Sequence, residues 1–362
     1  MAAKMNKNFI AQLIEKLETV NKSSYHIFTE QDLTLRKLTQ SNQEAREKIT
    51  KEFLQLASML NKNELTKFST QRQSIVNNLL QAPYDAKAAF GMHKAFFAER
   101  HEMAMFILEN LVDLKKITQY KIDNATPAGS YKIKVFTYWH DANSLPPLVS
   151  HCRASLKKYI SSEFDLIILD ENNYKDWIDC DLENLRNSIS QAHFTDLLRL
   201  RLLEKWGGFW LDATCLLSED FYTATHTIRQ QEHFFFSYIN SRVGNWFIWS
   251  KPHSYVITMI SEVLTCWWAQ KNRLTNYFMT HDIIEMLYWV DDEYRKHWDN
   301  MYKLHPKNAL LILREYNTIC SKDEFNIMLK SSFVHKLNYK YDTNKITKSG
   351  SLDRLLHNEN DQ

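Results

Sequence analysis

The stretch EKWGGFWLDATCLL, residues 204–217, limits what this chain can fold into more than any other. The chain has 362 residues but only six glycines, and two of them, Gly207 and Gly208, are adjacent here. Glycine is the residue that most readily takes the left-handed backbone conformation in which many helices end. The pair therefore predicts a helix that stops before Gly207 and a reversal of the chain into a short aromatic strand, FWLD, with Asp212 at its exit.

Composition excludes several classes of protein. Basic and acidic residues nearly balance, 45 Lys and Arg against 43 Asp and Glu, so no overall field would draw the chain onto nucleic acid. Charged residues interrupt the N-terminal segment and the most apolar later stretch, YVITMISEVLTCWW, before either reaches the length of a membrane span. We therefore expect a cytoplasmic protein without a transmembrane span, either soluble or held peripherally at the inner face of the membrane.

The pattern of apolar residues changes once along the chain. Up to about residue 120 it is helical, with stripes such as Phe9, Leu13 and Leu17 and a longer helix over 94–116. The turn-rich segment DNATPAGS, residues 123–130, follows, and apolar runs typical of strands appear beyond it. We predict a helical region at 1–125, an α/β domain at 126–340, and a polar, poorly ordered tail at 341–362.

The α/β domain opens with a strand, a helix and a second strand. YKIKVFTYW alternates in polarity, PPLVSHCRASLKKYI is an amphipathic helix that begins near Pro147, and FDLIILD is a continuous apolar run that reads as a buried strand. This order predicts a parallel sheet, whose ligands bind beyond the carboxyl ends of the strands. The residues expected near a site are those that follow the two strands: Trp139, His140, Asp141 and Asp170.

The helix before the glycine pair carries opposite charges on one face. Asp196 and Arg199 are three positions apart, so they lie side by side. Taken alone, they would be a surface ion pair, whereas for Asp212 a cap of the next turn and a functional role are equally good explanations. After Asp212, HFFFSY and NWFIWS are typical of strands, and helices are expected near 253–269 and 275–289.

An aromatic ring at one strand end, an Asp/Arg pair and an acid at another strand end suit a nucleotide-activated substrate. Such a substrate needs a ring to stack its base, polar side chains for its hydroxyls, and a carboxylate that holds a cation on its diphosphate. Lys, Arg and His can neutralise the leaving group, and SSFVHKLNYK supplies such residues. Taken alone, Trp139 is better explained as a core residue than as a platform for a base. The combination and its order are therefore more specific than any one of its members.

The stretch AHFTDLLRLRLLEKWGGFWLDAT resembles the bacterial capsular polysaccharide synthesis proteins, a branch of the sugar transferases that carry a DXD motif and have the GT-A fold. The pattern of that family is S/T-D-L-L-R, a helix, two glycines, two aromatic or aliphatic residues, and then D-A-T or D-x-D. Further matches in family order are VFTYWHD, GNWFIWSKPHS, NYFMTHDIIEMLY and FVHKL. The resemblance implies a Rossmann-like α/β domain of the GT-A class, to which the N-terminal helices are an extension.

The resemblance assigns roles to residues in the first half of the domain. It implies that Trp139 stacks on the nucleotide base, and that Asp196 and Arg199 hold the ribose and sugar hydroxyls of the donor. Asp212 matches the first acid of the DXD motif, so it would face the sugar and the metal ion on the diphosphate. Asp196, Arg199 and Asp212 are therefore the expected catalytic residues.

The later part of the domain supplies further expected contacts. His335 and Lys336 match a segment that closes over the diphosphate. Asn245 and Trp246 fall where related enzymes shape the sugar and acceptor pocket. One position departs from the family pattern, because Thr214 stands where the wider group has the second DXD acid.

This departure bears on the cofactor. A hydroxyl is a poorer ligand of Mg²⁺ or Mn²⁺ than a carboxylate. The resemblance still implies a divalent cation, bound by Asp212. The alternative is that metal dependence is weak and that Lys336 takes over part of the charge neutralisation.

The reaction implied is transfer of a sugar from a nucleotide-sugar donor, with UDP-sugars favoured, to a hydroxyl of a growing glycan or lipid-linked glycan. The wider group retains the anomeric configuration. One alternative is an inactive nucleotide- or glycan-binding subunit of an assembly complex, which Thr214 favours. A nucleotidyltransferase would normally show a glycine-rich phosphate loop after the first strand, and YWHDANSLPP has no glycine.

Overall fold

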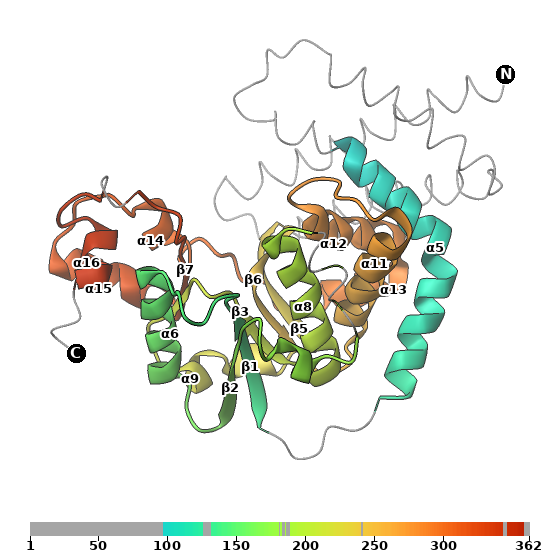
Figure 1. The fold of residues 1–362 in the computed structure, drawn as a ribbon, viewed down its shortest axis with the longest axis horizontal. Coiled ribbons are helices and arrows are strands. Elements are labelled where there is room, and N and C mark those ends of the chain that lie inside the picture. The colour runs from blue at the N-terminus through green and yellow to red at the C-terminus, as the bar shows by residue number, and fades with distance from the viewer. Residues whose placement is uncertain are drawn as a thin grey trace, which may run out of the picture. The chain divides into compact units, whose positions relative to one another are not determined.

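The computed structural model describes residues 97–125, 132–180, 182, 185, 189–239, 242–342 and 346–357 (Figure 1). It divides into two compact units. The first, which we call the helical unit, contains the described part of Met1–Tyr120 with Tyr238–Val243 and Glu262–Asn300. The second, the sheet unit, contains Lys121–Ser237, Gly244–Ser261 and Met301–Gln362. The apolar stripe at Phe9, Leu13 and Leu17 lies outside the described residues.

The central sheet has five strands in the order β2-β1-β3-β6-β5. These strands are β1 (Ile133–Tyr138), β2 (Phe164–Leu169), β3 (Gly208–Leu211), β5 (His233–Ile239) and β6 (Arg242–Ser250). β1 pairs in parallel with both β2 and β3, whereas β3 pairs antiparallel with β6. The sheet is therefore mixed, with a parallel core of three strands, and the fold is α/β and compatible with a Rossmann-like architecture.

Helices connect the parallel strands, as the strand, helix, strand order predicts. α6 (Pro147–Tyr159) links β1 to β2 and begins with Pro147, whose fixed backbone suits the first turn of a helix. α8 (Gln191–Trp206) links β2 to β3, and a short 3-10 helix (Tyr174–Trp177) lies between β2 and α8. β2 differs from the buried strand expected, because it lies at the edge of the sheet and its four middle residues are half-buried.

The glycine pair ends α8 in the predicted way. Gly207 and Gly208 have φ angles of 62° and 86°, in the left-handed region that favours glycine. A Cβ atom on Gly208 would lie 2.2 Å from the carbonyl oxygen of Lys134 in β1, and one on Gly207 would lie 2.5 Å from the backbone nitrogen of Pro252. Both glycines are therefore required, by backbone conformation and by close packing against other segments.

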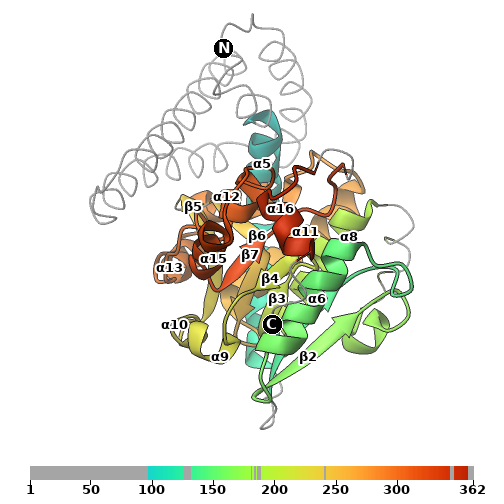
Figure 2. The same ribbon diagram turned by 90° about the vertical axis from the view of Figure 1, so that its left-hand side faces the viewer.

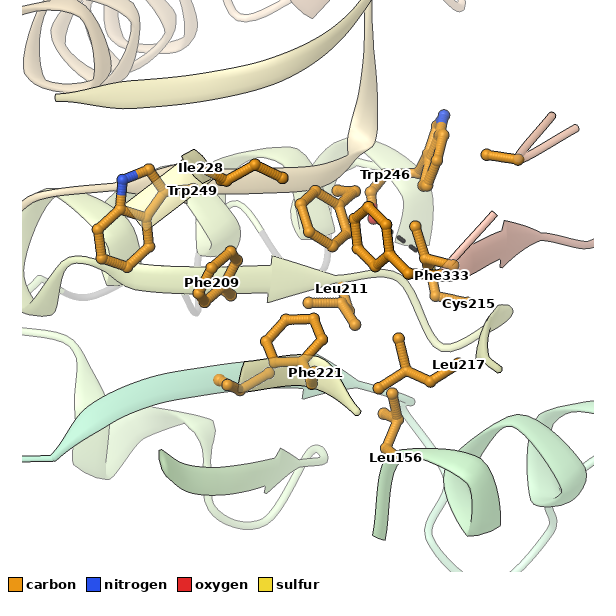
Figure 3. Packing of buried hydrophobic residues seen from close by; sticks show 14 of the residues in the cluster. Leu156, Phe209, Leu211, Cys215, Leu217, Phe221, Ile228, Trp246, Trp249 and Phe333 are labelled. Carbon is orange, nitrogen blue, oxygen red and sulfur yellow. Dashed lines mark hydrogen bonds between the residues drawn. The ribbon is translucent and has the colours of Figure 1, made fainter. Parts of the chain in front are cut away.

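Aromatic side chains fill one face of the sheet. Phe209 of β3 packs against Phe221 with ring centroids 4.9 Å apart, and against Trp249 of β6 at 4.7 Å (Figure 3). Phe221 belongs to α9 (Phe221–Ala224), which is followed by α10 (His226–Arg229). Since these rings are almost completely buried, they anchor β3 in the core and fix the point at which it ends.

A second, two-stranded sheet was not predicted from the sequence. β4 (Cys215–Leu217) pairs antiparallel with β7 (Val334–Lys336), with Cys215 opposite Lys336. Around it lie α14 (Leu311–Arg314), α15 (Lys322–Lys330) and α16 (Ser351–His357). Each strand has three residues, too short to show a period of two, so local pattern gives no signal for them.

The C-terminal tail, expected to be poorly ordered, contains α16. Leu352 and Leu355 are three positions apart and almost fully buried, in a cluster with Leu148 and Cys152 of α6. Figure 2 shows α16 beside α6. The expectation weighed the polar residues of the tail and overlooked this short apolar stripe.

The helical unit contains α12 (Met279–Val290), α13 (Asp292–Asp299) and most of α5 (Phe97–Asp123) and α11 (Tyr255–Lys271). Phe106 of α5 packs on Trp267 of α11 at 4.9 Å, and Lys115 of α5 forms an ion pair with Asp291 at 2.9 Å. These contacts explain why residues 262–300, which we expected in the α/β domain, group with α5. In the part of the chain that the structure describes, no helix is long and apolar enough to cross a membrane.

Candidate functional site

Asp212 lies directly after β3 and is held in place by its own backbone. Its N–H donates to the carbonyl of Trp246 at 2.9 Å, which continues the pairing of β3 with β6. Its carbonyl accepts the N–H of Cys215 at 2.8 Å and so closes a turn that brings Thr214 close to it. The carboxylate caps no backbone N–H of this turn; its partners are the side chains of Trp210, Arg199 and Lys336.

One oxygen of Asp212 faces α8 and β3. The indole nitrogen of Trp210 donates to Oδ1 at 2.9 Å, and the Arg199 guanidinium lies 3.4 Å from the same oxygen. The guanidinium also lies over the Trp210 ring, 5.2 Å from its centroid. Trp210 and Asp212 are two positions apart on an extended segment, so their side chains share one side of it.

The Asp196 and Arg199 pair predicted on α8 is present but lies largely in the interior. The guanidinium of Arg199 is 3.3 Å from the carboxylate of Asp196. The Arg199 side chain is only 6% exposed and the Asp196 side chain 11%. Asn245 of β6 donates to Asp196 at 3.0 Å, and its carbonyl accepts a hydrogen bond from Arg199. The three residues therefore fix α8 to β6 and hold a positive charge behind Asp212.

The other oxygen of Asp212 faces the two-stranded sheet. The ammonium nitrogen of Lys336 lies 2.8 Å from Asp212 Oδ2 and 2.7 Å from the hydroxyl oxygen of Thr214. The backbone reinforces the contact, because the N–H of Leu337 donates to the carbonyl of Thr214 at 2.9 Å. Lys336 and Asp212 keep 22% and 21% of their side-chain surface exposed. A ligand can therefore reach this pair more easily than the nearly buried pair of Asp196 and Arg199.

The charges fix the ionisation state of the site. Burial alone would raise the pKa of the Asp212 carboxyl, but the Lys336 ammonium and the Arg199 guanidinium outweigh it and hold the pKa at about 2. Burial likewise opposes the charge of Lys336, yet the neighbouring carboxylate raises its pKa above 10.5. Both groups are therefore charged throughout the physiological range.

His335 does not join this cluster. Neighbouring residues of a strand point to opposite sides, and His335 points away from Lys336 into the protein, where none of its surface is exposed. Its Nε2 lies 2.9 Å from the carbonyl of Leu329, and burial lowers the pKa of its imidazole. In this position His335 supports the fold, and the contact with the diphosphate that the resemblance implies for it stays a prediction.

Trp139 and Trp246 are also mostly buried, 9% and 5% exposed. The Trp139 indole N–H donates to the carbonyl of Ser144 at 3.3 Å. The rings of Trp139 and Tyr339 are perpendicular, with their centroids 4.8 Å apart. Trp246 stacks on Phe236 at 4.8 Å within the aromatic core (Figure 3). Because little of the Trp139 ring is exposed, its expected role in stacking a base stays a prediction.

The acids after β1 and β2 are engaged in their own turns. Asp141 accepts the backbone N–H of Asn143 at 2.9 Å, and Asp170 accepts that of Asn172 at 2.7 Å. These bonds are typical of Asx-turns, in which an aspartate stabilises the loop that it starts. The position of these acids after the strands is thus explained by loop geometry.

The side chains around Asp212 do not form a divalent-cation site. Mg²⁺ is usually held by one or two carboxylates together with substrate phosphates and waters, and both carboxylate oxygens of Asp212 already accept hydrogen bonds, from Trp210 and Lys336. The ammonium of Lys336 already fills the space between Asp212 and Thr214, where a shared metal ion would lie. Within the described ranges, no three His, Cys, Asp or Glu side chains gather as a metal-binding group. The residues therefore do not fit the cation that the resemblance implies.

Sequence comparison adds the family. A profile of the capsular polysaccharide synthesis protein family matches residues 85–355, well over half of the chain. The chain belongs to this family. Membership indicates a role in capsular polysaccharide synthesis, and the match contains every residue of the charged cluster. No curated protein and no solved structure matches the chain significantly.

Proposed function

We propose that this member of the capsular polysaccharide synthesis family is a glycosyltransferase of the GT-A class. It would move a sugar from a nucleotide-sugar donor to a hydroxyl of a growing capsular or surface polysaccharide. The observation that carries the proposal is the ionised, partly exposed carboxylate of Asp212, held at the end of a strand of a mainly parallel sheet between two cations. Ligands of such sheets bind at this edge, and a negatively charged donor needs nearby cations.

In the proposed reaction, the bond between the anomeric carbon and the diphosphate breaks, and the diphosphate oxygen keeps the electron pair. The acceptor hydroxyl oxygen forms the new bond to the anomeric carbon. Its proton passes to the departing diphosphate, so the reaction needs no protein base. Transfer on the same face of the sugar would retain the anomeric configuration, and we propose this outcome.

The roles of the side chains follow from their exposure. Asp212 faces the sugar, since its carboxylate is reachable and ionised. Arg199 and Asp196 act as positioning residues, because each is nearly buried and contacts the site through Asp212 or Arg199. This differs from the direct contact with donor hydroxyls that the family resemblance implies.

The test is a panel of UDP-, GDP-, CMP- and dTDP-sugars scored for hydrolysis and transfer by the full chain. We expect turnover of at least one donor. In Asp212→Asn this turnover should fall by about a hundredfold or more, the size of effect seen when one preorganised electrostatic group is removed. Asp220→Asn is the matched control, because Asp220 caps the short helix α9 at the surface and should leave turnover unchanged.

A second candidate function is favoured by one observation. Both oxygens of Asp212 are already engaged by protein groups, and Thr214 replaces an acid, which suits a nucleotide- or glycan-binding subunit without activity. The panel separates the two functions. Binding without turnover of any donor would favour the inactive subunit, whereas turnover that Asp212→Asn removes from a folded protein would exclude it. An inverted product linkage, read by NMR, would contradict retention.

A further inference from the structure

Lys336 occupies the place that a metal ion would take in a site with two acids. It lies between Asp212 and Thr214, the positions that match the first and second acids of the DXD motif. Its ammonium nitrogen is 2.8 Å from the carboxylate and 2.7 Å from the hydroxyl, both normal distances for charge-assisted hydrogen bonds. The protein therefore builds a fixed positive charge where the wider group of sugar transferases binds a cation.

The ammonium also keeps a donor for a ligand. A protonated lysine has three N–H donors, and two of them are used by Asp212 and Thr214. In the described part of the chain, these are the ammonium's hydrogen-bond partners, and 22% of the side chain is exposed. The remaining N–H can donate to an oxygen that approaches from the solvent side. An anionic oxygen is favoured, since the ammonium stays charged.

The net charge of the cluster does not oppose the binding of an anion. Asp196 and Asp212 supply two negative charges, and Arg199 and Lys336 supply two positive charges, so the cluster is neutral before a ligand binds. A divalent cation added to Asp212 would meet the ammonium at close range, and it would gain only one carboxylate. A diphosphate would meet an available cationic donor instead. The donor set thus favours the anion over the metal ion.

We propose that the Lys336 ammonium takes the place of the divalent cation and stabilises the diphosphate of the donor, so that nucleotide binding and sugar transfer need no metal ion. This rests on the function proposed above. When the bond to the anomeric carbon breaks, the diphosphate oxygen that keeps the electron pair gains negative charge, and Lys336 donates a hydrogen bond to the diphosphate. The proton of that bond stays on the lysine. Asp212 and Thr214 hold the ammonium in place.

The test is calorimetric titration of the full chain with UDP, GDP and dTDP, in excess EDTA and again with Mn²⁺. We expect at least one of them to bind in EDTA, with an affinity that Mn²⁺ changes by less than about twofold. Lys336→Met keeps the length of the side chain but removes its charge, and it should weaken binding about tenfold or more. Lys336→Arg keeps the charge and should retain most of the binding. Lys205→Met removes another ion-paired lysine, which is partnered by Asp179, and should have no effect.

A double variant gives the converse test. Thr214→Asp combined with Lys336→Met restores the second acid and removes the ammonium, so the site should gain Mn²⁺ binding, detectable by electron paramagnetic resonance without any nucleotide. Nucleotide binding by this variant should then require Mn²⁺. Circular dichroism checks that each variant is folded, and if Lys336→Met fails to fold, the wild type in EDTA and Lys336→Arg still decide the question.

The outcomes separate this inference from the proposed function. Nucleotide binding by the wild type only when Mn²⁺ is present would overturn the inference and leave the glycosyltransferase proposal standing. Unchanged binding by folded Lys336→Met would also overturn it. Binding of none of the three nucleotides in either condition would overturn this inference, whereas the proposed function falls only if no donor of the panel, CMP-sugars included, is turned over.

Discussion

The two sheets of the sheet unit contribute opposite charges to one site. The five-stranded sheet and its helix α8 place Asp212 and the buried Asp196 and Arg199 pair, whereas the two-stranded sheet places Lys336. The large sheet packs on a dense aromatic core, and the small sheet joins that core through Cys215, Leu217 and Val334, while Leu216 belongs to a second cluster. The position of the acid follows from the end of β3 and its pairing with β6, whereas the position of the cation depends on a contact between residues 124 apart in sequence.

The two neighbouring residues of β7 repeat this contrast on a smaller scale. Lys336 faces a carboxylate and is charged, whereas His335 faces the interior, where burial lowers the pKa of its imidazole. A strand of three residues thus separates a partly exposed charged group from one that lies in the interior. If the large sheet places the acid and the small sheet places the cation, changes in the two sheets should have different effects.

The largest expected loss of stability and activity comes from a change in the large sheet. Gly208→Val should destabilise the protein by about 3 kcal/mol or more and abolish activity, because the side chain would enter the backbone of β1 at a positive φ. Gly350→Ala is the comparison and should cost stability too, but less, because its Cβ would strain against one backbone oxygen at 2.9 Å while its φ lies outside the left-handed region. Chemical denaturation measures both variants. A fully active and stable Gly208→Val would refute the role given to the glycine pair.

A smaller effect is expected where α8 meets β6. Asn245→Ala removes the hydrogen bond to Asp196, so a nearly buried carboxylate loses one partner while keeping Arg199. We expect a loss of about 1 to 2 kcal/mol in the free energy of unfolding, with part of the turnover retained. Asn308→Ala removes a hydrogen bond at the surface and should cost no more than about 0.5 kcal/mol. Equal losses in the two variants would contradict a positioning role for Asn245.

The smallest expected effect is that of His335 on the pH dependence of folding stability. The unfolded chain protonates its histidines near pH 6.5, about the ordinary value, but folded His335 does so only at lower pH. Its contribution to stability is therefore complete above about pH 6.5 and is lost as the pH falls through its folded pKa. Between pH 7.5 and 5.5, His335→Gln should lose less stability than the wild type, by up to about 1 kcal/mol. His140→Gln, at an exposed position, should match the wild type. Parallel pH profiles for His335→Gln and the wild type would show that burial of this imidazole is irrelevant.

Much of the large sheet could be predicted from the sequence because its signals are local. The run at 133–138, the helix that begins at Pro147 and the glycine pair each specify their own structure within a few residues. The side chains at Asp196, Arg199 and Asp212 were found by spacing and by family resemblance. Trp210 was missed as a partner of Asp212, although two positions on a strand share a face and could have indicated it.

The small sheet and its contacts could not be predicted in the same way. β4 and β7 are each three residues long, and the contact between Thr214 and Lys336 joins positions 122 residues apart. No local pattern encodes such a pairing, so the sequence indicated Lys336 as a member of a late basic segment and, through the family resemblance, as part of a segment that closes over the diphosphate. Burial was equally hidden, so the same resemblance placed His335 beside Lys336 at the ligand.

The most direct test of the central claim is a double-mutant cycle across the two sheets. The quantity measured is kcat/KM for the donor found in the panel, in the wild type, Asp212→Asn, Lys336→Met and the variant with both changes. If the carboxylate and the ammonium act as one unit, each single change already breaks it, and the double variant should lose little more than the worse single variant. If the losses of the two single variants multiply in the double variant, the two sheets act independently and the account is wrong.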